Sequence, residues 1–144
     1  MEIDKIFDLW NEDSVIDQDN LEAESLKISQ LHHKYYKILV LEAVQFKKLE
    51  NDMKSLKLAK YEFYADGPSK ETKELGWDYP LRGKLLKTEI PSYMDGDQQI
   101  IELNTKMFLQ QQKIDLLTSI IKNITDRQWN IKNALESMKF KVGQ

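Results

Sequence analysis

Glycine and proline, the residues that most often interrupt regular structure, are confined almost entirely to one segment of this 144-residue chain. All three prolines and four of the five glycines fall between Gly67 and Gly96, and the fifth glycine is Gly143. Residues 1–66 and 97–142 therefore contain neither residue. Because glycine and proline punctuate a chain, this distribution predicts two long regular segments joined by a connection of about thirty residues.

The first stretch has apolar residues at a seven-residue spacing. Two interleaved series, starting at Leu21 and Ser25, have apolar or aromatic residues at nine of thirteen positions. The four exceptions are Ser25, His32, Glu42 and Lys60. This pattern is typical of a helix that packs along one face. We expect a helix from about residue 19 to 65, with Asp17, Asp19 or Asn20 as its cap.

The second stretch follows the same rule. The series that start at Ile100 and Leu103 are apolar at ten of twelve positions, with Gln110 and Gln128 as the exceptions. Asp95 or Asp97 is the expected cap. Since Thr125 and Asp126 could begin a new helix with its own cap, residues 97–142 form either one bent helix or two.

The pattern as a whole predicts an all-α protein with a single helical domain over residues 1–144. Its parts are an acidic N-terminal segment (1–18), a long helix (19–65), a connecting loop (66–96) and a C-terminal helical oligomerisation segment (97–142). Apolar residues off the main seam, such as Val40, Val44 and Phe108, need a partner surface, and another copy of the chain can supply it. We therefore expect a homo-oligomer held together by Ile114, Leu117, Ile121, Ile124, Trp129, Ile131, Leu135 and Met138.

The charge is unevenly distributed along the chain. Residues 1–24 hold nine acids and one base, a net charge of −8, so the other 120 residues carry +5. The acidic segment could contact a partner protein, fold onto basic helix faces of its own assembly, or simply increase solubility.

Several classes of protein are disfavoured by composition. The chain has no cysteine, and its only histidines, His32 and His33, are neighbours that cannot face one metal ion from a helix. No phosphate-binding glycine loop or nucleophile motif is present, so we expect no enzyme activity, no metal and no cofactor. No apolar run is long enough to span a membrane, and the N-terminus lacks signal-peptide features, which indicates a cytoplasmic protein.

The basic residues point to nucleic acid. Five lysines lie between Lys47 and Lys60 against two acids, and the sequence YEFY follows directly. Ammonium groups neutralise phosphates while exposed bases stack on aromatic rings, which is the chemistry that single-stranded nucleic acid requires. The candidate DNA-binding residues are Lys54, Lys57, Lys60, Tyr61, Tyr64, Arg82, Lys84 and Lys87.

Four segments together resemble a known family. They are DSVID at residues 13–17, KLAKYEFY at 57–64, LKTEI at 86–90, and ITDRQWNIKNA at 124–134. In this order and spacing the sequence is similar to the UvsY recombination mediators of T-even-type bacteriophages, over nearly the whole chain.

This resemblance implies a small helical protein that forms a ring, with a heptamer as the expected assembly. It also implies binding of single-stranded DNA without sequence preference, and loading of a UvsX-type recombinase in place of the phage single-strand-binding protein, in the host cytoplasm. The family's basic pair before the paired aromatics maps onto Lys60 and onto Leu58, a departure that leaves the neighbouring Lys57 or Lys54 to supply the second cation. The family's assembly segment corresponds to residues 124–140.

A structural or adaptor coiled coil without any role in nucleic-acid binding is the alternative interpretation. The heptads alone predict it equally well. Binding of labelled oligonucleotide at low and high salt separates the two hypotheses.

Overall fold

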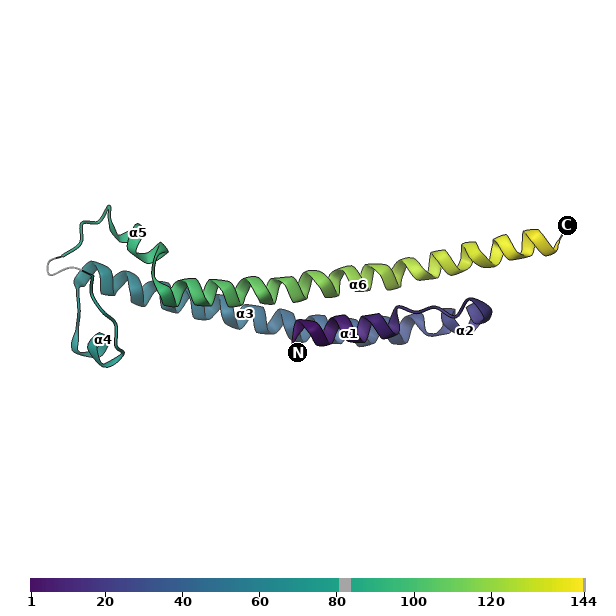
Figure 1. Cartoon of the computed structure of the whole chain (residues 1–144), viewed down its shortest axis with the longest axis horizontal. Coiled ribbons are helices and arrows are strands. Elements are labelled where there is room, and N and C mark those ends of the chain that lie inside the picture. The colour runs from purple at the N-terminus through teal and green to yellow at the C-terminus, as the bar shows by residue number, and fades with distance from the viewer. Residues whose placement is uncertain (81–83, 144) are drawn as a thin grey trace. The chain divides into compact units, whose positions relative to one another are not determined.

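The computed structural model describes residues 1–80 and 84–143, and within these ranges all regular structure is helical (Figure 1). The prediction of an all-α protein is therefore confirmed. The elements are α1 (Ile3–Asp13), η1 (Gln18–Asn20, a 3-10 turn), α2 (Leu21–Leu26), α3 (Ile28–Asp66), α4 (Lys70–Glu74), α5 (Ile90–Asp95) and α6 (Gln98–Val142). No helix within the described ranges has a stretch apolar enough and long enough to cross a lipid bilayer.

The long helix expected from residue 19 to 65 is interrupted near its start. Lys27 separates α2 from α3, and its N–H bonds to the carbonyl of Glu24 at 3.2 Å, three residues back instead of four. This tighter bond closes α2, and α3 then runs without a break for 39 residues. Asp17 does act as a cap, but for η1, where its side chain accepts from the Asp19 N–H.

The second long segment forms one helix. α6 continues for 45 residues through Thr125, whose hydroxyl donates to the Ile121 carbonyl within the helix at 3.0 Å. The Thr125 side chain therefore bonds backwards into its own helix and does not cap a new one. Of the two expected caps it is Asp97 that serves, since its Oδ1 accepts from the N–H groups of Gln99 and Ile100 at 3.0 and 3.1 Å.

The connection between the long helices contains two short helices. α4 begins with a capping box in which Ser69 and Thr72 exchange side-chain and backbone hydrogen bonds. Gly67 and Gly76 flank α4 with φ values of +86° and +77°. These left-handed conformations favour glycine and explain why the turns around α4 use it.

The chain divides into two compact units. Unit 1 comprises Met1–Val44 and Gln110–Gln144, and unit 2 comprises Gln45–Leu109. Each unit has its own apolar core. In unit 1 the buried residues Ile6, Tyr35, Leu117, Ile120 and Ile124 come from α1, α3 and α6. In unit 2 the core consists of Phe63, Tyr64, Leu85 and Ile90.

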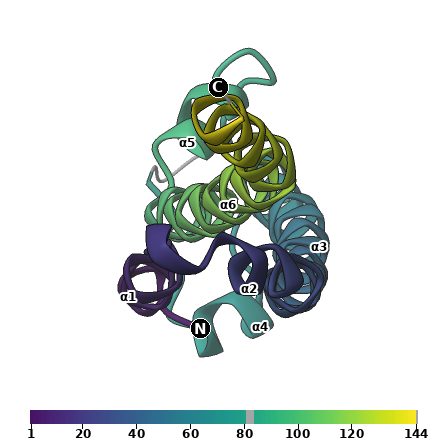
Figure 2. The same cartoon turned by 90° about the vertical axis from the view of Figure 1, so that its right-hand side faces the viewer.

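In unit 1, α1 packs against both long helices, and the end-on view in Figure 2 shows the three as neighbouring rods. Ile6 is completely buried, whereas Phe7 is 52% exposed. The Trp10 ring meets Tyr35 edge-on with centroids 5.5 Å apart, and the Arg127 guanidinium lies 5.0 Å from the centre of the Trp10 ring. The acidic N-terminal segment is therefore folded onto its own chain.

Two of the polar exceptions in the heptad series meet in unit 1. Glu42 of α3 and Gln110 of α6 are both buried. The Gln110 amide donates to the Glu42 carboxylate at 2.6 Å and to the Glu42 carbonyl at 2.8 Å. Burial raises the pKa of Glu42, but the bonds from Gln110 and from the N-terminal ammonium outweigh it, and the pKa lies below its usual value.

Candidate nucleic-acid interface

The C-terminal half of α3 carries the predicted lysine face, and most of it is accessible. Lys54 and Lys57 are exposed and lie one helical turn apart. Among the described residues neither ammonium has an acidic partner within ion-pair distance. Their positive charges are therefore available to an external anion.

Lys60, the third predicted cation of this helix, occupies a different environment. Its side chain is buried, with only 4% of the residue exposed, and its Nζ lies 3.0 Å from Oδ2 of Asp97. The same ammonium is 3.8 Å from the centre of the Trp77 ring, a cation–π contact. In this structure Lys60 acts as an internal counter-ion, because its position in the heptad series turns it toward the core of unit 2.

Of the two predicted tyrosines, Tyr64 is internal and Tyr61 is accessible. Tyr64 is buried and donates its hydroxyl to Asp97 at 2.6 Å, and burial together with this bond raises its pKa. Tyr61 is 47% exposed. Only Tyr61 can therefore offer its ring to a ligand.

Asp97 receives bonds on both carboxylate oxygens. Oδ2 accepts from Tyr64 and faces Lys60, while Oδ1 caps α6. Burial raises the pKa of Asp97, but the hydrogen bonds from Tyr64, Lys60 and the Ile100 N–H outweigh it and hold the pKa below its usual value. The carboxylate is thus ionised at neutral pH and joins the end of α3 to the start of α6 within unit 2.

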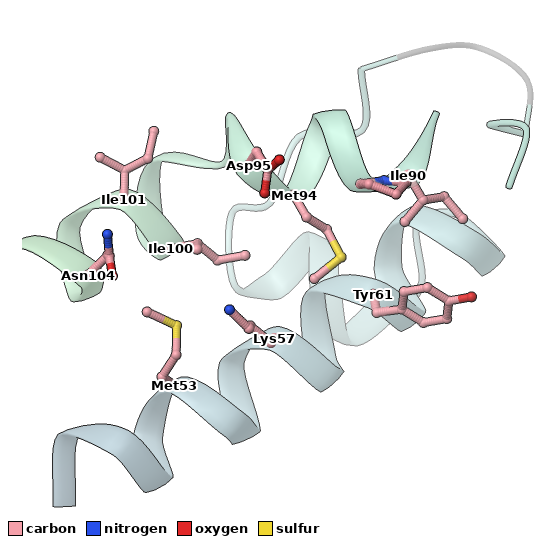
Figure 3. Close-up of a pocket in the computed structure, with 10 residues that line it drawn as sticks. Met53, Lys57, Tyr61, Ile90, Met94, Asp95, Ile100, Ile101 and Asn104 are labelled. Carbon is pink, nitrogen blue, oxygen red and sulfur yellow. The ribbon is translucent and has the colours of Figure 1, made fainter. Parts of the chain in front are cut away.

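An open pocket lies beside Lys57 and Tyr61 (Figure 3). Its volume is about 390 Å³, and it is enclosed by the last turns of α3, by α5 and by the first turns of α6. The principal lining residues are Met53, Lys57, Tyr61, Ile90, Met94, Asp95, Ile100 and Asn104. Figure 3 shows Met53 and Lys57 reaching toward the pocket from α3, opposite Met94. Cation, aromatic ring and apolar floor thus meet at one place.

The connecting segment adds two more accessible lysines. Lys84 and Lys87 are exposed, and the buried Leu85 between them anchors the segment in the core of unit 2. The Tyr79 hydroxyl donates to the Tyr64 carbonyl at 3.0 Å and accepts from the Leu85 N–H at 3.1 Å, which ties this segment to α3. Arg82, also predicted as a DNA contact, lies outside the described residues.

The predicted oligomerisation residues fall into two groups. Leu117, Ile124 and Ile131 are buried within the single chain, and Ile114 and Ile121 are partly buried. The remaining three are exposed on α6: Trp129, Leu135 and Met138. Leu117, Ile121 and Ile124 of the inward group pack in the core of unit 1, whereas the outward group is exposed in the single chain.

Sequence reasoning missed the opposite wall of the pocket, which is made by α5 and the start of α6. Met94 and Asn104 have no periodic or motif signal that would mark them, and Asp95 was marked only as a possible helix cap. Pro91 was a partial signal, because proline fits the first turn of a helix and could have indicated α5.

These features define an all-α protein with an accessible lysine–aromatic surface and exposed apolar side chains on its last helix. The sequence matches the family described as recombination, repair and ssDNA binding protein UvsY over residues 9–144. The chain therefore belongs to the UvsY family, whose description names a role in recombination and repair and no catalysed reaction.

The fold is similar to crystal structures of the bacteriophage T4 recombination mediator protein UvsY. One structure, lattice type II, matches with a TM-score of 0.84 at 16% identity, covering 99% of this chain and 98% of that one. Lattice type IV gives 0.80 at 16% identity, covering 98% and 99%, and lattice type I gives 0.81 at 17% identity, covering 95% and 98%. No curated protein matches the chain significantly in sequence.

Proposed function

We propose that this protein is a recombination mediator that binds single-stranded DNA without sequence preference and promotes loading of a recombinase in place of a single-strand-binding protein. The observation that carries the proposal is the surface formed by Lys54, Lys57 and Tyr61, where two cations that form no ion pair with any described residue adjoin an exposed ring. Such a surface binds phosphates and stacks bases without reading their edges. Membership of the UvsY family supports the same function.

The DNA contacts we retain are Lys54, Lys57, Tyr61, Lys84 and Lys87, because all five are exposed. Lys60 and Tyr64 hold this surface in place from the core of unit 2, because both bind Asp97 and so fix the end of α3. They are therefore assigned a positioning role and not a direct contact.

Each subunit offers only a few phosphate contacts, so tight binding requires several subunits on one strand. Linking weak sites raises overall affinity without any new contact. The exposed Trp129, Leu135 and Met138 supply an apolar surface for such an assembly. A ring is the form that the family resemblance implies, with a heptamer as its expected size.

The proposed partners follow from this mechanism. A strand held along a ring of lysines is constrained in shape, and this constraint would weaken its contacts with a phage single-strand-binding protein while presenting it to a UvsX-type recombinase. The acidic α1 is packed within unit 1, so its outward acids, such as Asp4 and Asp8, remain for a partner contact.

The test is fluorescence anisotropy of a labelled single-stranded oligonucleotide at low and high salt. We expect affinity to fall steeply with salt, because phosphate neutralisation releases counterions. The double variant Lys54→Ala and Lys57→Ala should weaken binding and flatten the salt dependence. Lys5→Ala, which removes an equally exposed lysine from the acidic segment, is the matched control and should bind like the wild type.

Absence of binding in dilute buffer would refute the proposal and favour the adaptor interpretation. The exposed apolar residues of α6 would then serve assembly alone. Unchanged binding by the double variant would refute the site but not the function.

A further inference from the structure

We propose that the pocket between α3 and α5 receives one unstacked nucleobase from the bound strand, so that each subunit holds a base as well as phosphates. This inference rests on the proposed function and adds a specific ligand class for a specific cavity. General phosphate binding requires only surface lysines, and it leaves this pocket of about 390 Å³ without a role. The volume lies within the range of pockets that hold small organic ligands.

The floor and walls suit the faces of a planar ring. Met53 from α3, Ile90 and Met94 from α5, and Ile100 from α6 supply apolar contacts. Methionine sulfur makes favourable contacts with aromatic rings and adapts to rings of different size. Tyr61 stands at one end of the pocket with about half of its surface open to stacking (Figure 3).

The position of the Lys57 ammonium determines where the phosphate backbone of the bound DNA passes the pocket. Lys57 lines the same pocket and has no acidic partner among the described residues. Its ammonium can meet the phosphate of the nucleotide whose base enters the pocket. Lys54, one turn earlier on α3, continues the positive path to a neighbouring phosphate.

The remaining polar residues explain why such a site can accept any base. Asp95 offers acceptors, and Asn104 offers both a donor and an acceptor. Each of the four bases can therefore find a partner for its polar edge. The Asp95 carboxylate also repels phosphate, which favours the orientation with the backbone at Lys57 and the base toward α5.

An apolar side chain from another copy is the competing occupant, and charge argues against it. A purely apolar ligand would cover the Lys57 ammonium and the Asp95 carboxylate while offering neither of them a polar partner, which is unfavourable. A nucleotide satisfies the cation and the apolar floor together.

The decisive experiment compares a normal single-stranded oligonucleotide with one of equal length whose nucleotides are abasic. Both have the same phosphates, so binding through lysines alone would treat them equally. We expect the wild-type protein to bind the abasic strand about tenfold more weakly or worse, because stacking contributes that much per base. Tyr61→Phe should preserve this discrimination and Tyr61→Ala should abolish most of it.

Two further variants make the result specific to the pocket. Met94→Ala removes part of the wall facing α3 and should reduce the ratio of normal to abasic affinity while leaving the salt dependence unchanged. Tyr36→Ala removes an exposed ring from the unit 1 part of α3 and should leave the ratio as in the wild type. Circular dichroism is the check that each variant is folded.

Equal, salt-dependent affinity of the wild type for both strands would overturn the inference and the stacking role of Tyr61, while leaving single-stranded DNA binding through the lysines intact. Failure to bind either strand would remove both. A change in native mass caused by Tyr61→Ala, without a change in the affinity ratio, would assign the pocket to contact between subunits and also overturn the inference.

Discussion

Lys60 and Asp97, separated by 36 intervening residues, form a buried ion pair of 3.0 Å that joins the end of α3 to the residue that caps α6. Tyr64 donates to the same carboxylate, and Trp77 covers the ammonium. Removing one partner from such a pair leaves the other charge buried and uncompensated. Lys60 and Lys57 lie three residues apart on one helix. Mutation of Lys60 should therefore lower the stability of the fold, whereas mutation of Lys57 should lower only the affinity for DNA.

We predict that Lys60→Ala lowers the free energy of unfolding by about 3–5 kcal/mol, since it leaves Asp97 buried without its cation. Lys57→Ala should unfold like the wild type, because the lysine side chain is exposed and forms no ion pair within the described part of the chain. Urea unfolding monitored by circular dichroism measures both. Equal stability of the two variants would contradict the assigned roles. The DNA affinity of the still-folded Lys57→Ala variant should fall.

Acid should weaken unit 2 through Asp97. The pKa of this carboxyl lies below its ordinary value of 3.8, so its ionised form stabilises the fold above that pH. This stabilisation is lost as the pH falls through the lowered pKa. Asp97→Asn should be less stable than the wild type at pH 7 but less sensitive to acid. The midpoints of urea unfolding of both proteins are compared at pH 7 and pH 3. If acid lowers the two midpoints equally, Asp97 is not the group responsible for the loss of stability.

The packing of α1 can be tested with two adjacent residues. Ile6→Ala should destabilise unit 1 by about 2–5 kcal/mol, because the removed side chain is completely buried. Phe7→Ala removes a larger side chain that is half exposed, and it should cost much less. Thermal unfolding measures the two losses of stability, and the midpoint should fall further for Ile6→Ala than for Phe7→Ala. A greater loss for Phe7→Ala would mean that α1 packs through a different face.

Assembly should depend on the outward residues of α6. Trp129 is 63% exposed and Met138 is also exposed, so changing both to Ala should lower the native mass while helix content stays the same. Thr118→Ala, at another exposed position of α6, is the control and should leave the mass unchanged. Sedimentation velocity measures this directly, and an unaltered mass in the double variant would place the contact elsewhere.

The sequence pattern predicted the parts of the fold that depend on local spacing. Heptads located α3 and α6, and the distribution of glycine and proline located the end of α3 and both ends of α6. The expected start near residue 19 was wrong, because α3 begins at Ile28. The same heptad series placed Lys60 on the apolar seam. This position predicts that Lys60 is buried, although its charge alone predicts an exposed side chain. What spacing could not supply was the partner of Lys60, because Asp97 is distant in sequence and meets Lys60 only in the folded core of unit 2.

The pocket was beyond sequence reasoning for a related reason. α3 provides Met53, Lys57 and Tyr61 at helical spacing, which the pattern located. The opposite wall comes from α5, a helix of six residues inside a segment without periodicity. A short helix is held by tertiary contacts more than by its own propensity, so its position depends on the folded core of unit 2.

The hydrogen-bonded pair of Glu42 and Gln110 has a consequence for how the long helices align. Heptad seams of leucine and isoleucine resemble themselves after a shift of seven residues, so apolar packing alone permits several staggers. Sliding α6 by one repeat would bring Leu117 to the place of Gln110 and leave the Glu42 carboxylate dry and without that donor, which is costly. The Glu42–Gln110 layer thus favours one axial register of α3 and α6 over registers shifted by a heptad.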